Sequence, residues 1–136
     1  MCKNRCAIIK KKNAQKEVLN MKKVVFHIDE MKNWSLTLGN VKNLITFYEH
    51  HDEVFQIVVV ANGEAVKGYG KEDTQENIAK EILALFAKGI SFHACQNALR
   101  AQQLEAVDLL EHIVIVEAGV ADIVALQEKG FTYIKP

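Results

Sequence analysis

Cys95 is the residue whose type and place in this chain are best suited to chemistry. It stands where the strand predicted at 90–94 meets the helix predicted at 95–103. Backbone N–H groups and the positive end of the helix dipole favour a thiolate at such a position. The thiolate is the nucleophilic, sulfur-accepting form of cysteine. A small buried cysteine at a packed strand end is equally common, so position alone leaves both interpretations open.

Other polar side chains stand at the ends of the predicted strands. In an open parallel sheet, ligands bind beyond the carboxyl ends of the strands. The residues at these ends are His27 and Asp29 on the first strand, Asn62 on the second, His93 and Cys95 on the third, and Glu117 on the fourth. The sequence therefore predicts a polar edge around Cys95, with His27, Asn62 and His93 as supporting or binding residues.

His93 lies two residues before Cys95, so both side chains point to the same face of the strand. An imidazole there could act as a base or a cation for the thiol, as in a Cys–His hydrolase. We favour a histidine satisfied by backbone hydrogen bonds, because neighbours on one face need not bond to each other. His27 is expected beside His93 on the adjacent strand, with the same interpretation.

Alternating apolar runs and helical patterns must position these residues. Strands are predicted at 24–28, 55–61, 90–94, 113–116 and 131–134. Between them, apolar residues recur at helical spacing, as in Trp34, Leu38, Val41, Ile45 and Tyr48. Five short apolar strands separated by helices predict an α/β fold, a three-layer α/β/α arrangement with a mainly parallel five-stranded sheet.

Two local features concern the connection after the second strand. Residues 62–72 contain Gly63, Gly68 and Gly70, which predicts a mobile loop. Asp73 and Glu76 fit the cap that opens the next helix. Gly89 is typical of the position just past its end.

Length and charge divide the chain into two parts. With 136 residues, one domain is expected, at 22–136. Residues 1–23 carry eight basic side chains and one acidic one, whereas 24–136 carry nine basic and sixteen acidic ones. Residues 1–21 are interpreted as a basic extension outside the fold, favoured as an upstream extension of a reading frame that starts at Met21. An arm that binds membrane surfaces or nucleic acid is the alternative.

Several function classes lack their signatures. No Gly-x-Gly-x-x-Gly follows the first strand, and neither a phosphate-binding Gly-Lys-Ser/Thr loop nor a Cys-x-x-Cys pair occurs. Cys2 and Cys6 lack a partner pair for zinc, so no metal and no cofactor are expected. Without a long apolar run, and with an acidic body, no membrane span and no direct nucleic-acid contact are expected. A cytoplasmic protein is the default.

From Lys22 to Pro136 the chain resembles the DsrE/DsrF-like family, which includes the TusD-type sulfur relay subunits. The resemblance rests on four segments that occur in order along the chain. They are Lys23-Val24-Val25-Phe26-His27-Ile28, Val58-Val59-Val60-Ala61-Asn62-Gly63, Phe92-His93-Ala94-Cys95-Gln96-Asn97-Ala98-Leu99, and a C-terminal segment from Glu117 to Pro136. Residues 1–20 are left unmatched.

The resemblance implies a compact α/β/α domain that assembles into trimers or hexamers. It also implies that Cys95 carries sulfur as a persulfide and that Asn97, in a Cys-x-Asn pattern, shapes the turn or binds near the thiol. The leading hypothesis is a sulfur carrier that exchanges sulfane sulfur between donor and acceptor proteins. The alternative is a non-catalytic module for small-ligand binding or assembly, in which Cys95 is inert.

Overall fold

The computed structural model describes residues 20–136. Most of the predicted N-terminal extension lies outside the described residues. The strands are β1 (Lys22–Ile28), β2 (Phe55–Ala61), β3 (Ser91–Cys95), β4 (Val114–Val116) and β5 (Thr132–Ile134). The α-helices are α2 (Trp34–His50), α3 (Glu76–Ala87), α4 (Gln96–Ala101) and α5 (Gly119–Glu128). Three 3₁₀ segments join them: η1 (Met31–Asn33), η2 (Gly63–Tyr69) and η3 (Ala106–Asp108).

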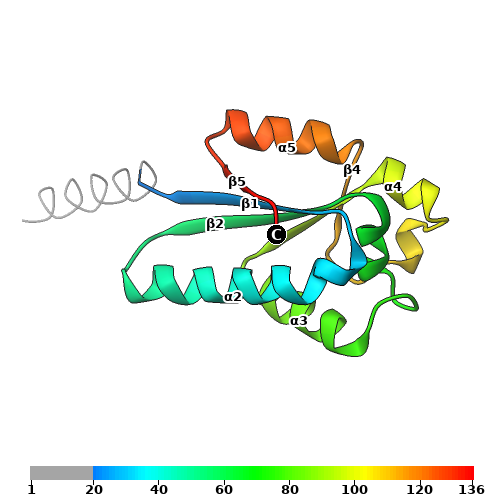
Figure 1. Ribbon diagram of the computed structural model, residues 1–136, viewed down its shortest axis with the longest axis horizontal. Helices are drawn as coiled ribbons and strands as arrows, with labels where there is room; N and C mark the ends of the chain where they lie inside the picture. Colours follow the sequence, from blue (N-terminus) through cyan, green and yellow to red (C-terminus); the bar gives the residue numbers. More distant parts are fainter. Residues whose placement is uncertain (1–19) are drawn as a thin grey trace, which may run out of the picture.

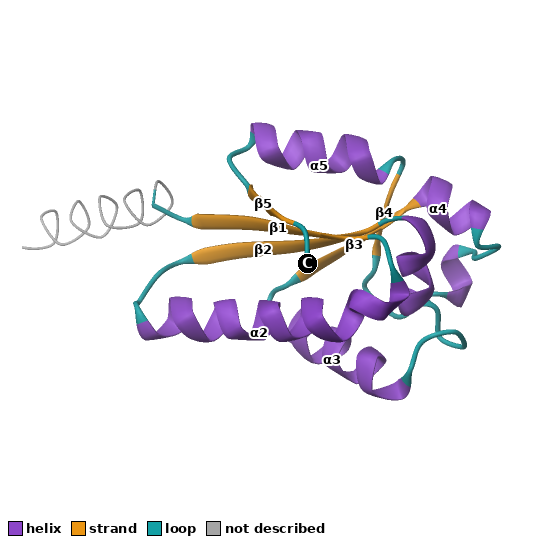
Figure 2. Ribbon diagram, viewed as in Figure 1, coloured by secondary structure: helices purple, strands orange, loops and turns teal. Residues whose placement is uncertain are grey.

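The five strands form one parallel sheet in the order β4-β3-β2-β1-β5. Helices α2 and α3 cover one face, and α5 covers the other (Figure 1). The predicted three-layer α/β/α fold is therefore confirmed. The successive crossovers from β1 to β4 run in one direction across the sheet, and α5 returns the chain to β5 at the opposite edge (Figure 2). This return places the start of α5 near the carboxyl ends of the central strands.

Burial on both faces explains the apolar sequences of β1 and β2. Residues 57–61 of β2 are all buried, as central strands of a covered parallel sheet must be. The edge strands β4 and β5 have only three residues each, and none of these is fully buried. Short edge strands also limit the backbone that is open to pairing with another chain.

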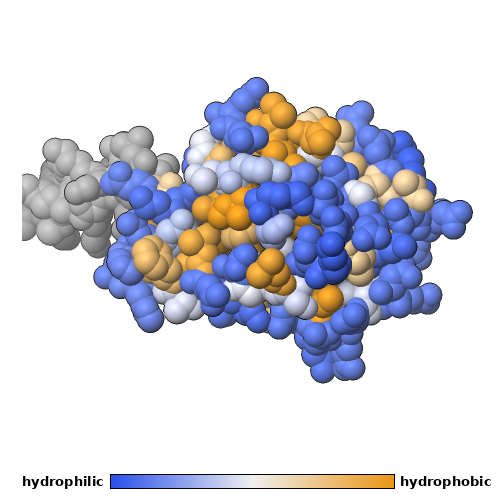
Figure 3. Space-filling model, in the orientation of Figure 1, coloured by the Kyte–Doolittle hydropathy of each residue, from blue (hydrophilic) through white to orange (hydrophobic). Residues whose placement is uncertain are grey.

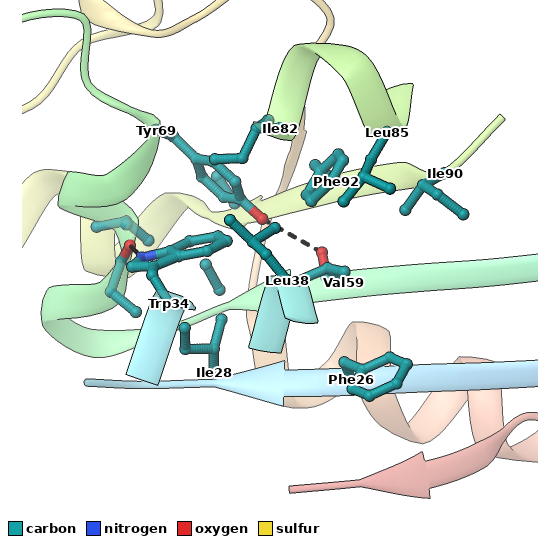
Figure 4. Close-up of a cluster of buried hydrophobic side chains, with 14 of the residues drawn as sticks. Phe26, Ile28, Trp34, Leu38, Val59, Tyr69, Ile82, Leu85, Ile90 and Phe92 are labelled. Atoms are coloured by element: carbon teal, nitrogen blue, oxygen red, sulfur yellow. Dashed lines mark hydrogen bonds between the residues drawn. The ribbon is translucent and has the colours of Figure 1, made fainter. Parts of the chain in front are cut away.

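The larger part of the core lies between the sheet and helices α2 and α3. Three aromatic rings run through it: Trp34 meets Tyr69 at 5.1 Å between ring centroids, and Tyr69 meets Phe92 at 6.2 Å (Figure 4). All three are buried, as are the helical residues Leu38 and Ile82. The smaller part lies beneath α5 and consists of Val25, Val58, Val60, Ile123, Leu126 and Phe131.

The prediction of a mobile loop at 62–72 is wrong. Most of this segment is η2, which is packed into the core through Ala65, Val66, Gly68 and Tyr69. The Tyr69 hydroxyl donates to the Val59 carbonyl at 3.3 Å, and burial raises the pKa of this phenol well above its usual range. The glycines here serve close packing, because Gly68 lies directly against the Trp34 indole.

The predicted helix boundaries need smaller corrections. Helix α3 begins after Gln75, whose side chain makes no capping hydrogen bond, so Asp73 and Glu76 do not form the predicted cap. Its end agrees with the sequence, since Gly89 has a φ of +95°, a conformation that glycine adopts without strain. Helix α4 spans only Gln96–Ala101, shorter than the predicted 95–103.

Candidate functional site

Asn62, Cys95 and Gly119 meet at the carboxyl edge of the sheet. Asn62 directly follows β2, Cys95 ends β3, and Gly119 begins α5. A methyl group added at Gly119 would lie 3.1 Å from the Cβ of Cys95 and 3.5 Å from the Cγ of Asn62. Two predicted site residues therefore lie together, and the start of α5 closes over them.

Asn62 is held in place by its own backbone and side chain. Its N–H donates to the Ile28 carbonyl at 2.8 Å, and its carbonyl accepts from the Ala65 N–H at 3.1 Å. Its side-chain oxygen accepts from the Gly63 N–H at 2.9 Å and so caps η2. The amide nitrogen is left facing Gly119, at 3.6 Å from a methyl group built there. Asn62 thus forms one wall beside Cys95.

Cys95 is a free cysteine with only 4% of its surface exposed. Its backbone is extended and forms the N-cap of α4, and its Cβ lies beside the first residue of α5. The predicted position at a strand–helix junction is confirmed. Cys95 also belongs to the larger core cluster, so a reagent reaches the thiol only after a local opening of the structure.

Asn97 is exposed on the first turn of α4, two residues beyond Cys95. The contact that joins Asn62, Cys95 and Gly119 is formed without it. Its predicted role in shaping the turn or binding near the thiol stays a prediction.

The hydrogen bonds of His93 go to residues other than Cys95. Its Nδ1 bonds to the Asp122 carboxylate on α5 at 2.7 Å, and its Nε2 bonds to the Ser91 hydroxyl at 3.0 Å. The histidine is hydrogen-bonded, as favoured, but its partners are side chains and not the expected backbone groups. With both ring nitrogens engaged elsewhere, the Cys95–His93 hydrolase pair is not formed.

His27 lies one strand further from His93 than predicted. The two histidines sit on β1 and β3, and Val60 of β2 stands between them in the register. Nδ1 of His27 is 2.7 Å from the Tyr133 hydroxyl, and its Nε2 is buried without a partner. Burial lowers the pKa of His27, and the nearby Lys135 ammonium adds to this effect.

This environment makes the stability of the fold depend on pH. The unfolded chain takes up the His27 proton near pH ~6.5, whereas the folded protein does so only at lower pH. Neutral His27 contributes fully to the free energy of unfolding when the pH is above its unfolded-state pKa. This contribution is lost as the pH falls from there through the lower pKa of the folded state. We expect a melting temperature that falls between pH 7 and 5, and a shallower fall in His27→Phe.

Tyr133→Phe is the control for this measurement, because it leaves the imidazole buried. Thermal unfolding at several pH values should give Tyr133→Phe the wild-type slope. An unchanged slope in His27→Phe would contradict the expectation.

Within residues 20–136, no group of three or more His, Cys, Asp or Glu side chains is placed to hold a metal ion. None of the helices in the same range combines the length and apolar character needed to cross a bilayer.

Comparisons with known proteins identify the family of this chain. The profile of the DsrE/DsrF-like family matches residues 6–136. The chain belongs to the DsrE/DsrF-like family. The match extends upstream of residue 22, into the segment that the resemblance left unmatched.

Solved structures agree with this membership. MTH1491 from Methanobacterium thermoautotrophicum, described as a protein of unknown function, is 34% identical, with a TM-score of 0.76 over 85% of this chain and 99% of its own. The YchN protein of E. coli shares the fold at 12% identity, with a TM-score of 0.59 over 85% of this chain and all of its own. BT1422 from Bacteroides thetaiotaomicron, also of unknown function, does so at 13% identity and a TM-score of 0.63, over 88% and 97%. No curated protein matches significantly.

Sequence reasoning missed the residues that α5 supplies. Gly119 is the first residue of α5 and packs on Cys95. Asp122, which binds His93, is 29 residues away from it along the chain. The sequence offers little indication of this role for Asp122, because a single acidic residue in the first turn of a helix more often complements the helix dipole.

Proposed function

We propose that this protein carries sulfane sulfur as a persulfide on Cys95. The observation that carries the proposal is the place of the thiol. Cys95 lies at the carboxyl edge of a DsrE/DsrF-like sheet, beside the first residues of both α4 and α5. The thiolate is the form of cysteine that attacks sulfur.

The exchange is balanced without an external oxidant. The Cys95 thiolate attacks the outer sulfur of a donor persulfide, the donor S–S bond breaks, and the donor leaves as a thiolate. A new S–S bond on Cys95 then holds the sulfur until an acceptor thiolate removes it in the same way. Cys95 is the single cysteine between residues 20 and 136, so within that range no second thiol can displace the sulfur as a disulfide.

The enclosed thiol favours a second candidate. A cysteine that is 4% exposed suits an inert packing residue in a binding or assembly module. The two candidates differ in one property, namely whether the Cys95 thiol becomes accessible under native conditions.

Self-association is part of the proposal. Apolar side chains lie at the surface over α5, where Val120 and Val124 are exposed, and near α2, where Phe47 is exposed (Figure 3). A relay also requires donor and acceptor proteins. Light scattering is expected to give the mass of a trimer or hexamer, and a monomer would contradict this part.

Intact-mass spectrometry after incubation with a persulfide donor tests the carrier function. The background is Cys2→Ser with Cys6→Ser, so that Cys95 is the one thiol left. We expect a gain of one sulfur atom that a reductant reverses, and no gain when Cys95→Ser is added. Complete absence of sulfur uptake in the folded protein would overturn the proposal in favour of the binding or assembly module.

A further inference from the structure

Ser91, His93 and Asp122 form a chain of hydrogen bonds that the Cys95 site does not use. The Asp122 carboxylate is 2.7 Å from Nδ1 of His93, and the Ser91 hydroxyl is 3.0 Å from Nε2 of the same ring. Ser91 and His93 come from one face of β3, and Asp122 comes from the first turn of α5. The fold thus joins a serine, an imidazole and a carboxylate through two successive hydrogen bonds.

The chemistry of these groups fixes the direction of each bond. An ionised carboxylate only accepts hydrogen bonds, so Nδ1 of His93 must carry the proton that it shares with Asp122. In the neutral ring, Nε2 is then the acceptor, and the Ser91 hydroxyl donates to it. This is the proton arrangement in which an imidazole can activate a serine hydroxyl as a nucleophile.

The line of groups is open to small molecules. The His93 and Asp122 side chains retain 15% and 17% exposure, and Ser91 is partly exposed. Strand β4 begins only at Val114, which pairs with His93, so Ser91 pairs with Val58 of β2 and with no residue of β4. Helix α5 packs over β1, β2 and β3, and Val114 of β4, which pairs with His93, is 44% exposed.

We propose that Ser91 is a nucleophile for the acyl groups of small esters. Its oxygen attacks the ester carbonyl carbon while the hydroxyl proton passes to Nε2 of His93. The bond to the alcohol oxygen breaks, and the leaving alcohol takes that proton. Water then cleaves the acyl-serine by the same route, so the net reaction is ester hydrolysis with no redox change. His93 is the general base, and Asp122 is a positioning residue.

The surroundings define the class of substrate. Val114 stands beside His93 on the same face and is 44% exposed, which offers apolar contact to a short acyl chain. The Asp122 carboxylate repels anionic acyl groups. A short, uncharged acyl ester therefore fits better than a long lipid ester or a dicarboxylate.

An alkyl fluorophosphonate tests the proposal, because it phosphonylates activated serines with loss of fluoride. The chain has two serines, and exposed Ser35 is an internal control. In the full-length protein we expect Ser91 to be labelled at least ~100-fold faster than Ser35, the usual gain from a positioned base. Peptide mass spectrometry locates the label.

Variants separate the roles of the three groups. His93→Gln should reduce labelling of Ser91 to the rate of Ser35. Asp122→Asn should slow it at least ~tenfold, and Asp122→Glu should restore part of the rate at an unchanged melting temperature. Equal labelling of the two serines in the wild-type protein, a comparison that needs no variant, would overturn the proposal. So would undiminished labelling of Ser91 in folded His93→Gln.

Discussion

Gly68→Ala is expected to destabilise the protein by about 3 kcal/mol or more. The added methyl group would lie 2.2 Å from Nε1 of Trp34, far inside van der Waals contact. Trp34 is fully buried, and its indole N–H donates to the Ala65 carbonyl at 2.9 Å, so the ring cannot move away freely. Overpacking alone costs about 1–3 kcal/mol, and a broken buried hydrogen bond adds about 1–3 kcal/mol.

Thermal unfolding measures this effect against a matched substitution. Gly39→Ala makes the same chemical change within α2, where no atom beyond the neighbouring helix backbone lies within 4 Å of the new methyl group. We expect Gly68→Ala to lower the melting temperature by about 10 °C or more. Gly39→Ala should raise stability by about 0.5–1 kcal/mol through helix propensity. Similar melting temperatures for Gly68→Ala and the wild type would show that η2 does not pack on Trp34 as described.

The same contact explains why the sequence misled at residues 62–72. Glycine occurs both in flexible loops and where two segments pack closely. The sequence alone does not distinguish these two roles. The burial of Tyr69 beside Trp34 depends on residues 35 positions apart, which a local pattern cannot reveal. The apolar runs of the strands, by contrast, act locally, so they predicted all five strands and the three layers.

The sequence predicted only those site residues that stand at the ends of strands. Cys95 and Asn62 stand at strand ends, and the parallel sheet brings such ends to one edge. The strand order could not be read from the sequence, so His27 was placed beside His93, although β2 separates them. The partners from α5, Gly119 and Asp122, depend on how that helix crosses the sheet, which is a tertiary property.

Alkylation of Cys95 is expected to be at least ~100-fold slower in the folded protein than in the denatured chain. Cys95 is only 4% exposed, and its Cβ lies beside Gly119, so reaction of the thiol requires a local opening. An opening that costs about 3 kcal/mol reduces the reactive population ~100-fold. Iodoacetamide kinetics in the Cys2→Ser, Cys6→Ser background measure the rate.

Gly119→Val tests where the opening occurs. Its branched side chain would press on Cys95, from which even a single methyl group at this position is 3.1 Å away. An overpacking cost of about 1–3 kcal/mol in the closed form should accelerate alkylation ~5- to 100-fold. Gly39→Val, with no neighbour beyond the adjacent helix backbone within 4 Å of the first added carbon, should leave the rate unchanged.

The two rates together connect access to function. If sulfur reaches Cys95 through the same opening, persulfide uptake in Gly119→Val should accelerate by the same factor as alkylation. Faster alkylation without faster uptake would mean that a step after opening, such as donor docking, limits sulfur transfer. An unchanged alkylation rate in folded Gly119→Val would place the opening away from the start of α5.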